Sequence, residues 1–441
     1  MASAAAHAAT FYVAPPPAGS NGNPGSAAAP WATLQFAADT IGPGDTVIVR
    51  AGQYAAFEVG IEASQALPVV FRAAPGELVE LVTDLPGRLV GVNIENSSWI
   101  TIEGFRANGR GIAGFRAALS EHITFRGNVA QNNGVWGIFT GCCDDVVIEG
   151  NLAAGSCEEH GIYVSNSGDR PILRGNVIFD NNANGIHMNG DLSSDCGADT
   201  DNDGLIGQAI VEGNLIYDNG HGECTSPGGG SGVNGDGLQD SVIRNNVIWD
   251  AHHSGISLYQ IDGGAPANGN RVLGNTIHTA ADGRWALNIM DGAQGTVIRD
   301  NILYSEHSFR GAISACATCL TGLASDRNAT EDTFSIDGGD TAITLAQWRT
   351  ATNQDLASFV ATPASLVVSA ATGNYRLADG SAALNAGVAH AELTRDHEGT
   401  PRPQGAAHDV GAFEGSGGLF RDGFEGGSPV RWSDAQGAGP W

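Results

Sequence analysis

The sequence predicts an all-β solenoid built from stacked β-coils, on the strength of three observations. A phrase ending in Gly-Asn, Asn-Asn or Asp-Asn recurs along the middle of the chain, and from Asn128 onward its asparagines are spaced 23, 25, 38, 32, 29 and 26 residues apart. The residues around each phrase alternate between apolar and polar, without the spacing of an amphipathic helix. A period in the twenties is typical of a repeat architecture, in which each coil buries its inner face against its neighbours.

The recurring asparagine is expected at the same corner of every coil. Glycine and asparagine tolerate the left-handed backbone angles of a tight corner, and stacked asparagine side chains can hydrogen-bond along the solenoid axis. A second phrase follows most copies and reads GIFTG from Gly137, GIYVS from Gly161, GIHMN from Gly185 and GISLY from Gly255. We therefore assign the asparagines a structural role and look for chemistry in the second phrase.

The composition excludes some classes of partner. The chain has 441 residues and a formal net charge of -27, and all 21 of its basic residues are arginine. Such a surface repels nucleic acid and anionic membranes, and no apolar run approaches the roughly 18 residues of a membrane-spanning helix. A polyanionic substrate would need a local arginine cluster or a bound cation to hold it.

The start of the chain and the cysteines indicate export. The first residues read MASAAAHAATFYV, in which AHA before Ala9 fits a signal-peptidase site, so residues 1–9 are interpreted as the remnant of a leader. Seven cysteines are present, and the Cys316-x-x-Cys319 pair has no second pair that would complete a zinc set. In an exported protein they are expected to form disulfides, with Cys196–Cys224 tying one long insertion.

Three further segments carry a resemblance to a known family. Residues 30–54 read as an amphipathic helix followed by PGDTV, which starts the first strand, and residues 375–414 (YRLADG to DVGAFE) read as a closing segment. Residues 419–433 (LFRDGFEGGSPVRWS) are similar to a short tail of exported bacterial proteins. Over residues 10–415 the chain resembles the right-handed parallel β-helix family of secreted carbohydrate-active proteins.

The resemblance implies a right-handed parallel β-helix with an N-terminal capping helix. Caps at both ends would cover exposed strand edges, and a capped solenoid is expected to be a monomer. Residues 416–441 form the expected C-terminal tail. Insertions are expected at about 191–235, 260–270 and 315–370, the last with a helix around LAQWRTATNQDLASFV. Such loops crowd one face of a solenoid, which is often the binding face.

Alternation predicts a row of polar side chains on the outside of the coils. In the second phrases Ile162, Val164, Ile186, Met188, Ile256 and Leu258 are expected inside, as are Trp285, Leu287 and Ile289. The intervening residues then face solvent. Neighbouring coils lie about 4.8 Å apart, so Tyr163, His187, Gln239, Tyr259 and Arg284 are expected to form a ladder along an extended, acidic polysaccharide.

A phenol, an imidazole and a guanidinium suit proton removal next to a carboxylate. Lytic members of the family commonly use lysine or arginine as the base with calcium on the uronate, and this chain has no lysine. The expected reaction is therefore β-elimination with His187 as base, Tyr259 or Tyr163 as acid and Arg284 as carboxylate clamp. His160 and His253 at coil corners complete the catalytic candidates, and the substrate-binding candidates are Asn189, Gln239, His252, Asn288 and Asp236.

A calcium site is expected in the most acidic loop, residues 191–204. Asp199, Asp201 and Asp203 with Gly204 reproduce the beginning of a calcium-binding loop, with Asp191 nearby. The motif is partial, because Ile210 stands where a later bidentate glutamate would be. A structural role for this calcium ion is preferred over a catalytic one.

Three other functions are compatible with the sequence. A glycoside hydrolase could use paired carboxylates from Asp236, Asp240 and Glu158, which would have to lie roughly 5–9.5 Å apart. A C5-epimerase of the same fold would carry an Asp-Pro-His signature that this chain lacks. A non-catalytic glycan-binding protein would present aromatic platforms, such as Trp136 or Trp249, without a titratable cluster.

Overall fold

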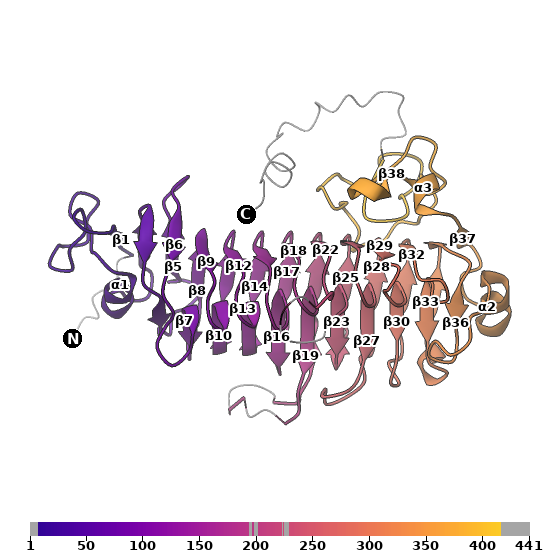
Figure 1. Ribbon diagram of the computed structural model, residues 1–441, viewed down its shortest axis with the longest axis horizontal. Helices are drawn as coiled ribbons and strands as arrows, with labels where there is room; N and C mark the ends of the chain where they lie inside the picture. The colour runs from indigo at the N-terminus through magenta and orange to yellow at the C-terminus, as the bar shows by residue number, and fades with distance from the viewer. Residues whose placement is uncertain (1–7, 194–195, 198–201, 223, 225–228, 416–441) are drawn as a thin grey trace.

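The computed structural model describes residues 8–193, 196–197, 202–222, 224 and 229–415, and it confirms the all-β solenoid (Figure 1). Three long sheets of parallel strands run along the axis, and successive coils add one strand to each sheet. None of the helices in these residues is long and apolar enough to cross a membrane. The expected tail at 416–441 and most of the leader remnant lie outside the described residues.

The strands are named by sheet. Sheet 1 contains β1 (Thr10–Val13), β2 (Thr46–Val49), β5 (Val69–Ala73), β8 (Ile100–Glu103), β11 (Thr124–Arg126), β14 (Val147–Glu149), β17 (Ile172–Arg174), β21 (Ile210–Glu212), β25 (Val242–Arg244), β28 (Arg271–Leu273), β31 (Val297–Arg299) and β34 (Ala324–Asp326). Sheet 2 contains β4 (Phe57–Val59), β7 (Val90–Glu95), β10 (Ala113–Glu121), β13 (Trp136–Asp144), β16 (Ile162–Asn166), β19 (Ile186–Gly190), β23 (Val233–Asp236), β27 (Ile256–Tyr259), β30 (Leu287–Ile289), β33 (Ile313–Ala315) and β36 (Phe334–Ser335). Sheet 3 contains β3 (Gly52–Tyr54), β6 (Val79–Leu81), β9 (Phe105–Asn108), β12 (Val129–Gln131), β15 (Leu152–Ala154), β18 (Val177–Phe179), β22 (Leu215–Tyr217), β26 (Val247–Trp249), β29 (Thr276–Thr279), β32 (Ile302–Ser305), β35 (Ala329–Thr330) and β37 (Phe359–Val360).

A few elements lie outside the three sheets. They are the strand pairs β20 (Ile206–Gly207) with β24 (Leu238–Gln239) and β38 (Val367–Ser369) with β39 (Asn374–Leu377), the helices α1 (Leu34–Thr40), α2 (Leu345–Thr352) and α3 (Pro363–Leu366), and the 3-10 turns Thr318–Leu320 and Ala370–Thr372. The core lies inside the coils. Every residue predicted to face inward from the second phrases is buried, so the alternation was interpreted correctly.

A buried column of asparagines joins the coils at one corner. It comprises Asn128, Asn151, Asn176, Asn214, Asn246, Asn275, Asn301 and Asn328, all buried. Asn214 shows the pattern: its Oδ1 accepts the backbone N–H of Asn176 at 3.0 Å, and its Nδ2 donates to the carbonyl of Leu173 at 2.9 Å and to Oδ1 of Asn246 at 2.9 Å. The residue before each asparagine has the left-handed backbone, as at Gly213 with φ 62°. The predicted structural role of the repeat is confirmed.

Helices cover both ends of the solenoid. At the N-terminal end α1 buries Leu34 in the core, and β1 precedes it, so PGDTV begins the second strand and not the first. At the C-terminal end α2, in the region where a helix was predicted, buries Trp348 against Phe334 of the last strand of sheet 2, with ring centroids 5.2 Å apart (Figure 1).

The segment expected to close the C-terminal end lies elsewhere. Residues 375–414 pack along the side of sheet 3, where Val410 and Phe413 join Val247 and Ile302 in a second hydrophobic cluster (Figure 1). The physical reason is that these strands carry apolar residues that would otherwise face water, so this side of the solenoid needs a cover as much as the end does.

Two predictions about the long insertion were wrong. Residues 210–217 include coil strands of sheets 1 and 3, which divide the expected insertion at 191–235 into two parts, before β21 and after β22. Cys196 and Cys224 do not pair with each other. Cys142–Cys196 ties the first part to β13, Cys157–Cys224 ties the second part to the corner after β15, and Cys316–Cys319 forms a third disulfide while Cys143 is free and buried.

The asparagine column makes a prediction about stability. We expect Asn214→Ala to lower the free energy of unfolding by about 2–5 kcal/mol, because the Asn176 N–H and the Leu173 carbonyl lose their partners inside the protein. Urea denaturation followed by circular dichroism measures the change. Asn108→Ala, at an exposed strand end, is the control and should change it by less than about 0.5 kcal/mol. Equal losses in the two variants would contradict a special role for the column.

Candidate functional site

The outer face of sheet 2 carries the predicted ladder in a modified form. Strand register aligns Tyr163, His187, Asn234, Ser257 and Asn288 on successive coils. The neighbouring outward row aligns Ser165, Asn189, Asp236 and Tyr259. Tyr163, His187, Tyr259 and Asn288 therefore face the side that alternation predicted.

Gln239 is not part of the ladder. It belongs to β24, which pairs with β20 outside sheet 2, and its Nε2 donates to the carbonyl of Pro266 at 2.6 Å. The rung that was assigned to it is occupied by Asn234. The error arose because the coil after the long loops enters sheet 2 five residues earlier in the sequence than Gln239.

Buried His160 and partly buried His187 form a hydrogen-bonded pair at the outer face. Nε2 of His160 lies 2.9 Å from Nδ1 of His187. Burial lowers the pKa of His187 to about 3, and burial together with the charge of His187 lowers the pKa of His160 well below its usual value. Both rings are therefore neutral at neutral pH, and each carries a single N–H.

A backbone amide fixes the position of these protons. The N–H of Asn184 donates to Nδ1 of His160 at 3.2 Å, so the proton of this neutral ring is on Nε2, which donates to Nδ1 of His187. The proton of His187 is then on its own Nε2. That atom lies 3.5 Å from the hydroxyl oxygen of Tyr259, which also accepts a bond from Nδ2 of Asn234 at 2.7 Å. Two N–H groups thus point at the Tyr259 oxygen.

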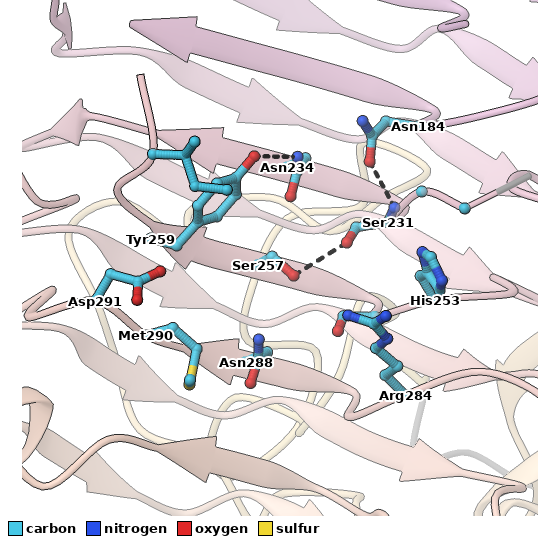
Figure 2. A pocket seen from close by; sticks show the side chains of 14 residues that line it. Asn184, Ser231, Asn234, His253, Ser257, Tyr259, Arg284, Asn288, Met290 and Asp291 are labelled. Atoms are coloured by element: carbon cyan, nitrogen blue, oxygen red, sulfur yellow. Dashed lines mark hydrogen bonds between the residues drawn. The ribbon is translucent and has the colours of Figure 1, made fainter. Parts of the chain in front are cut away.

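A cavity of about 350 Å³ opens beside Tyr259 on this face (Figure 2). Its lining residues are Asn184, Gly229, Gly230, Ser231, Asn234, His253, Ser254, Ser257, Tyr259, Ile261, Arg284, Asn288, Met290 and Asp291. Figure 2 shows Tyr259 on one side of the cavity with His253 and Arg284 on the opposite side. Tyr259, His253, Arg284 and Asn288 were predicted from the sequence, whereas Asn234, Ser257 and Asp291 were not singled out for the site.

The side of the cavity opposite Tyr259 is positively charged. Arg284 and Arg310 lie close enough for the charge of Arg284 to help burial lower the pKa of Arg310. Neither guanidinium forms an ion pair with a carboxylate in the described part of the chain. Burial, followed by the charges of these two arginines, lowers the pKa of His253 to about 4. The side chain of His253 has no hydrogen-bond partner among the described residues, so it offers a free neutral imidazole to the cavity.

Other candidate residues have structural partners. Nδ2 of Asn189 donates to the hydroxyl of Tyr163 at 3.2 Å, and the Tyr163 ring stacks on His187. The carboxylate of Asp236 accepts backbone N–H bonds from Ile261, Asp262 and Gly263 at 2.8–3.1 Å and so holds the loop after β27. Asp236 is therefore buried and bound to the backbone, so it does not suit the carboxylate pair that a hydrolase would need.

The remaining predicted residues lie away from the cavity. His252 turns from its neighbour His253 toward Asp218 and Asp282. Asp191 and Asp203 of the expected calcium loop accept bonds within their own loop, from Ser193 and from the N–H of Leu205 respectively. Asp199 and Asp201 lie outside the described residues, so the calcium site stays a prediction.

The histidine pair predicts acid sensitivity. The folded pKa of His187 is below the unfolded value of about 6.5, so below that pH only the unfolded chain takes up a proton, and stability falls as the pH falls toward 3. We expect His187→Asn to weaken this dependence, with the loss of unfolding free energy between about pH 7.5 and pH 4.5 smaller by about 2 kcal/mol. Urea denaturation at the two pH values measures it.

A matched control for that comparison is His122→Asn. His122 lies outside the cavity and stacks on Trp99, so its replacement tests whether any histidine would give the effect. An unchanged pH dependence in His187→Asn would contradict the assignment of a neutral ring.

Comparison with known proteins places the fold. Residues 79–222 match a family model described as NosD, periplasmic copper-binding protein, and residues 156–319 match the model of the right-handed β-helix region. The second match confirms the predicted hand of the coil. No curated protein matches the sequence.

Several solved structures share the fold. Pectate lyase Pel9A matches with a TM-score of 0.63 at 16% identity, over 93% of this chain and 97% of that one. XylC in complex with xylose matches with a TM-score of 0.57 at 10% identity, over 94% and 99%, and an alginate lyase from Paenibacillus sp. str. FPU-7 with 0.50 at 20% identity, over 60% and 90%. The chain is a right-handed parallel β-helix protein, and its structural neighbours are carbohydrate-active enzymes.

Proposed function

We propose that the protein is a polysaccharide lyase that cleaves a uronate-containing polysaccharide by β-elimination. One observation carries the proposal: the neutral imidazole of His253 and the guanidinium of Arg284 face the hydroxyl of Tyr259 across a single cavity, and neither has a side-chain partner among the described residues. Proton abstraction next to a carboxylate needs a base, a positive charge on the carboxylate and an acid for the leaving oxygen, and these groups supply all three.

The first step takes place on the positive side of the cavity. Arg284, with Arg310 nearby, binds the uronate carboxylate and stabilises the negative charge that develops when C5 loses its proton. His253 lies beside Arg284, and its free imidazole nitrogen accepts that proton. The electron pair of the C5–H bond then forms the C4–C5 double bond, while the bond from C4 to the glycosidic oxygen breaks.

The second step takes place at Tyr259. Its hydroxyl donates a proton to the leaving oxygen, and the resulting phenolate oxygen is stabilised by the N–H groups of His187 and Asn234. The products are an unsaturated uronate and a new reducing end, and the proton on His253 returns to Tyr259 through solvent. This assigns His187 a positioning role in place of the base role expected from the sequence.

Calcium takes no part in the proposed elimination steps. Asp191 and Asp203, with Asp199 and Asp201, have the oxygen donors that calcium prefers, and an ion held by them would neutralise the acidic loop 191–205. The elimination steps are derived from His253, Tyr259 and the two arginines.

Export is also proposed. Three disulfides indicate folding in an oxidising compartment, because such bonds are rare in the cytosol. Two of them tie the loops beside the active face, so reduction would loosen the region around the cavity before the coils themselves.

The activity can be tested on a panel of uronate polymers by following the ultraviolet absorbance of the unsaturated product. We expect an increase with at least one polymer. New reducing ends without that absorbance would show a hydrolase, a change of sugar configuration would show an epimerase, and binding without any reaction would show a glycan-binding protein. Each of these outcomes would overturn the lyase assignment.

Tyr259→Phe tests the acid. We expect kcat to fall by about 10²–10⁴-fold, the usual contribution of a positioned acid, while KM changes little. Tyr217→Phe is the matched control, since its ring stacks between Phe179 and Trp249 on sheet 3, away from the cavity. Full activity in Tyr259→Phe would exclude the tyrosine as acid.

Arg284→Gln tests the carboxylate clamp. We expect kcat/KM on the uronate polymer to fall by about 10²-fold or more, because the developing charge loses its counter-charge. Arg72→Gln, an exposed arginine on sheet 1, should have wild-type activity. If the two variants behaved alike, the positive side of the cavity would have no part in the reaction.

A further inference from the structure

A second cluster of chemistry-bearing residues lies on the edge of sheet 3, outside the cavity. Asp218 follows β22 and Asp250 follows β26 at equivalent corners of successive coils, both with left-handed backbone (φ 53° and 51°). The backbone N–H of Asp218 donates to the carbonyl of Trp249, which places the two corners one above the other. Asp180 holds the same position one coil earlier. Three carboxylates are thus stacked along the axis.

Two histidines face this stack. Nε2 of His252 lies 3.5 Å from Oδ1 of Asp218. Nε2 of His221 lies 3.6 Å from the same oxygen and 3.1 Å from Oδ1 of Asp180. One ligand atom each from Asp218, Asp250 and His252 lie within 4.8 Å of one another. Imidazole nitrogens and carboxylate oxygens are the donors that borderline divalent metals prefer.

One of these separations fits two ligands of one ion better than a hydrogen bond. The distance of 3.5 Å between Nε2 of His252 and Oδ1 of Asp218 is too long for a strong hydrogen bond. Bonds of about 2.0–2.1 Å to zinc in tetrahedral geometry leave neighbouring ligand atoms about 3.3–3.4 Å apart. A small shift of either side chain would therefore bring these atoms to the geometry of a shared ion, which would also relieve the repulsion among the stacked carboxylates.

The other face of His252 is already held. Its Nδ1 lies 2.9 Å from Oδ1 of Asp282 and 3.0 Å from Oδ2. When Nε2 of His252 is deprotonated, this contact keeps its lone pair directed at Asp218. Metal-binding histidines are usually oriented in this way by an outer carboxylate.

We propose that Asp218, Asp250 and His252 bind one divalent transition-metal ion of the zinc class, with Asp282 orienting His252. The site is distinct from the calcium loop at 191–205 and does not depend on the lyase activity.

An ion bound at this site would affect the structure of the neighbouring cavity. Asp218 and His221 begin the loop 218–232, and the backbone of Gly229 in that loop packs against the ring of His253 in the cavity. His252 and His253 are adjacent in sequence but face the metal cluster and the cavity respectively. A bound ion would therefore join the loop to the coil that carries His253 and fix one wall of the cavity.

The test is titration of the chelator-treated full-length protein with zinc chloride by isothermal calorimetry, in a buffer that contains excess calcium. We expect one zinc per chain in wild type and a loss of affinity of at least 10-fold in Asp218→Asn and in His252→Gln. Asp282→Asn leaves the ligand atoms in place and should weaken binding by about 10–100-fold. His122→Gln, at a histidine–aspartate pair with Asp145 away from this cluster, is the control and should bind as wild type does.

Cobalt provides a second readout. We expect cobalt chloride to give the visible absorption of a four-coordinate nitrogen and oxygen site, and this absorption should be lost in Asp218→Asn. Circular dichroism shows whether each variant is folded. If a ligand variant does not fold, the zinc affinity of Asp282→Asn still tests the proposal. Absence of saturable zinc binding in wild type, or equal binding in folded Asp218→Asn and wild type, would show that the cluster is only a set of ion pairs.

Discussion

The buried asparagine column is the interaction on which the rest of the molecule depends. Each asparagine satisfies a backbone N–H of the preceding coil and a carbonyl further back, so it fixes both the corner and the register of its coil. A slip by one residue in any strand would send its outward side chains into the core. Residues far apart in sequence become neighbours only because register is held, as with His187 and Tyr259, which are 72 positions apart.

Burial then determines the chemistry of the groups on sheet 2. The same desolvation that keeps His160 and His187 neutral makes their proton positions depend on hydrogen bonds alone. A single backbone amide, that of Asn184, is enough to orient the pair and to present an N–H to Tyr259. Since a backbone amide cannot titrate, this arrangement persists wherever the fold does. A site built in this way needs no charged group next to the tyrosine to polarise its hydroxyl.

The sequence predicted the fold and the regular parts of the site because both follow from local periodicity. Tyr163, His187, Tyr259 and Asn288 were placed on the outer face by alternation, which the strand itself enforces. Gln239 was misplaced because the extra pair β20 with β24 interrupts the coil, and no local pattern distinguishes its strand from that of Asn234.

Contacts made by loops could not be predicted in the same way. The cysteine pairs depend on which coil each of two loops folds against, and spacing alone does not order them. Arg310 and Asp218 lie outside the repeated phrases, so nothing in their neighbourhood marked them. Arg310 lies near Arg284, and Asp218 lies near His252. The two residues of each pair come from different coils, so they are neighbours only in the folded solenoid.

The charge distribution reconciles an acidic protein with an acidic substrate. The net charge of -27 acts at long range, where salt screens it within about 8 Å at physiological ionic strength. Many of the other arginines are paired with carboxylates along the coils, for example Arg170 with Asp144 and Asp145. Arg284 and Arg310 have no such partner among the described residues; Arg284 is exposed at the cavity and Arg310 is half-buried near it. The surface thus disfavours nonspecific retention of a polyanion, while one position on sheet 2 offers positive charge at contact distance, which is where a lyase needs it.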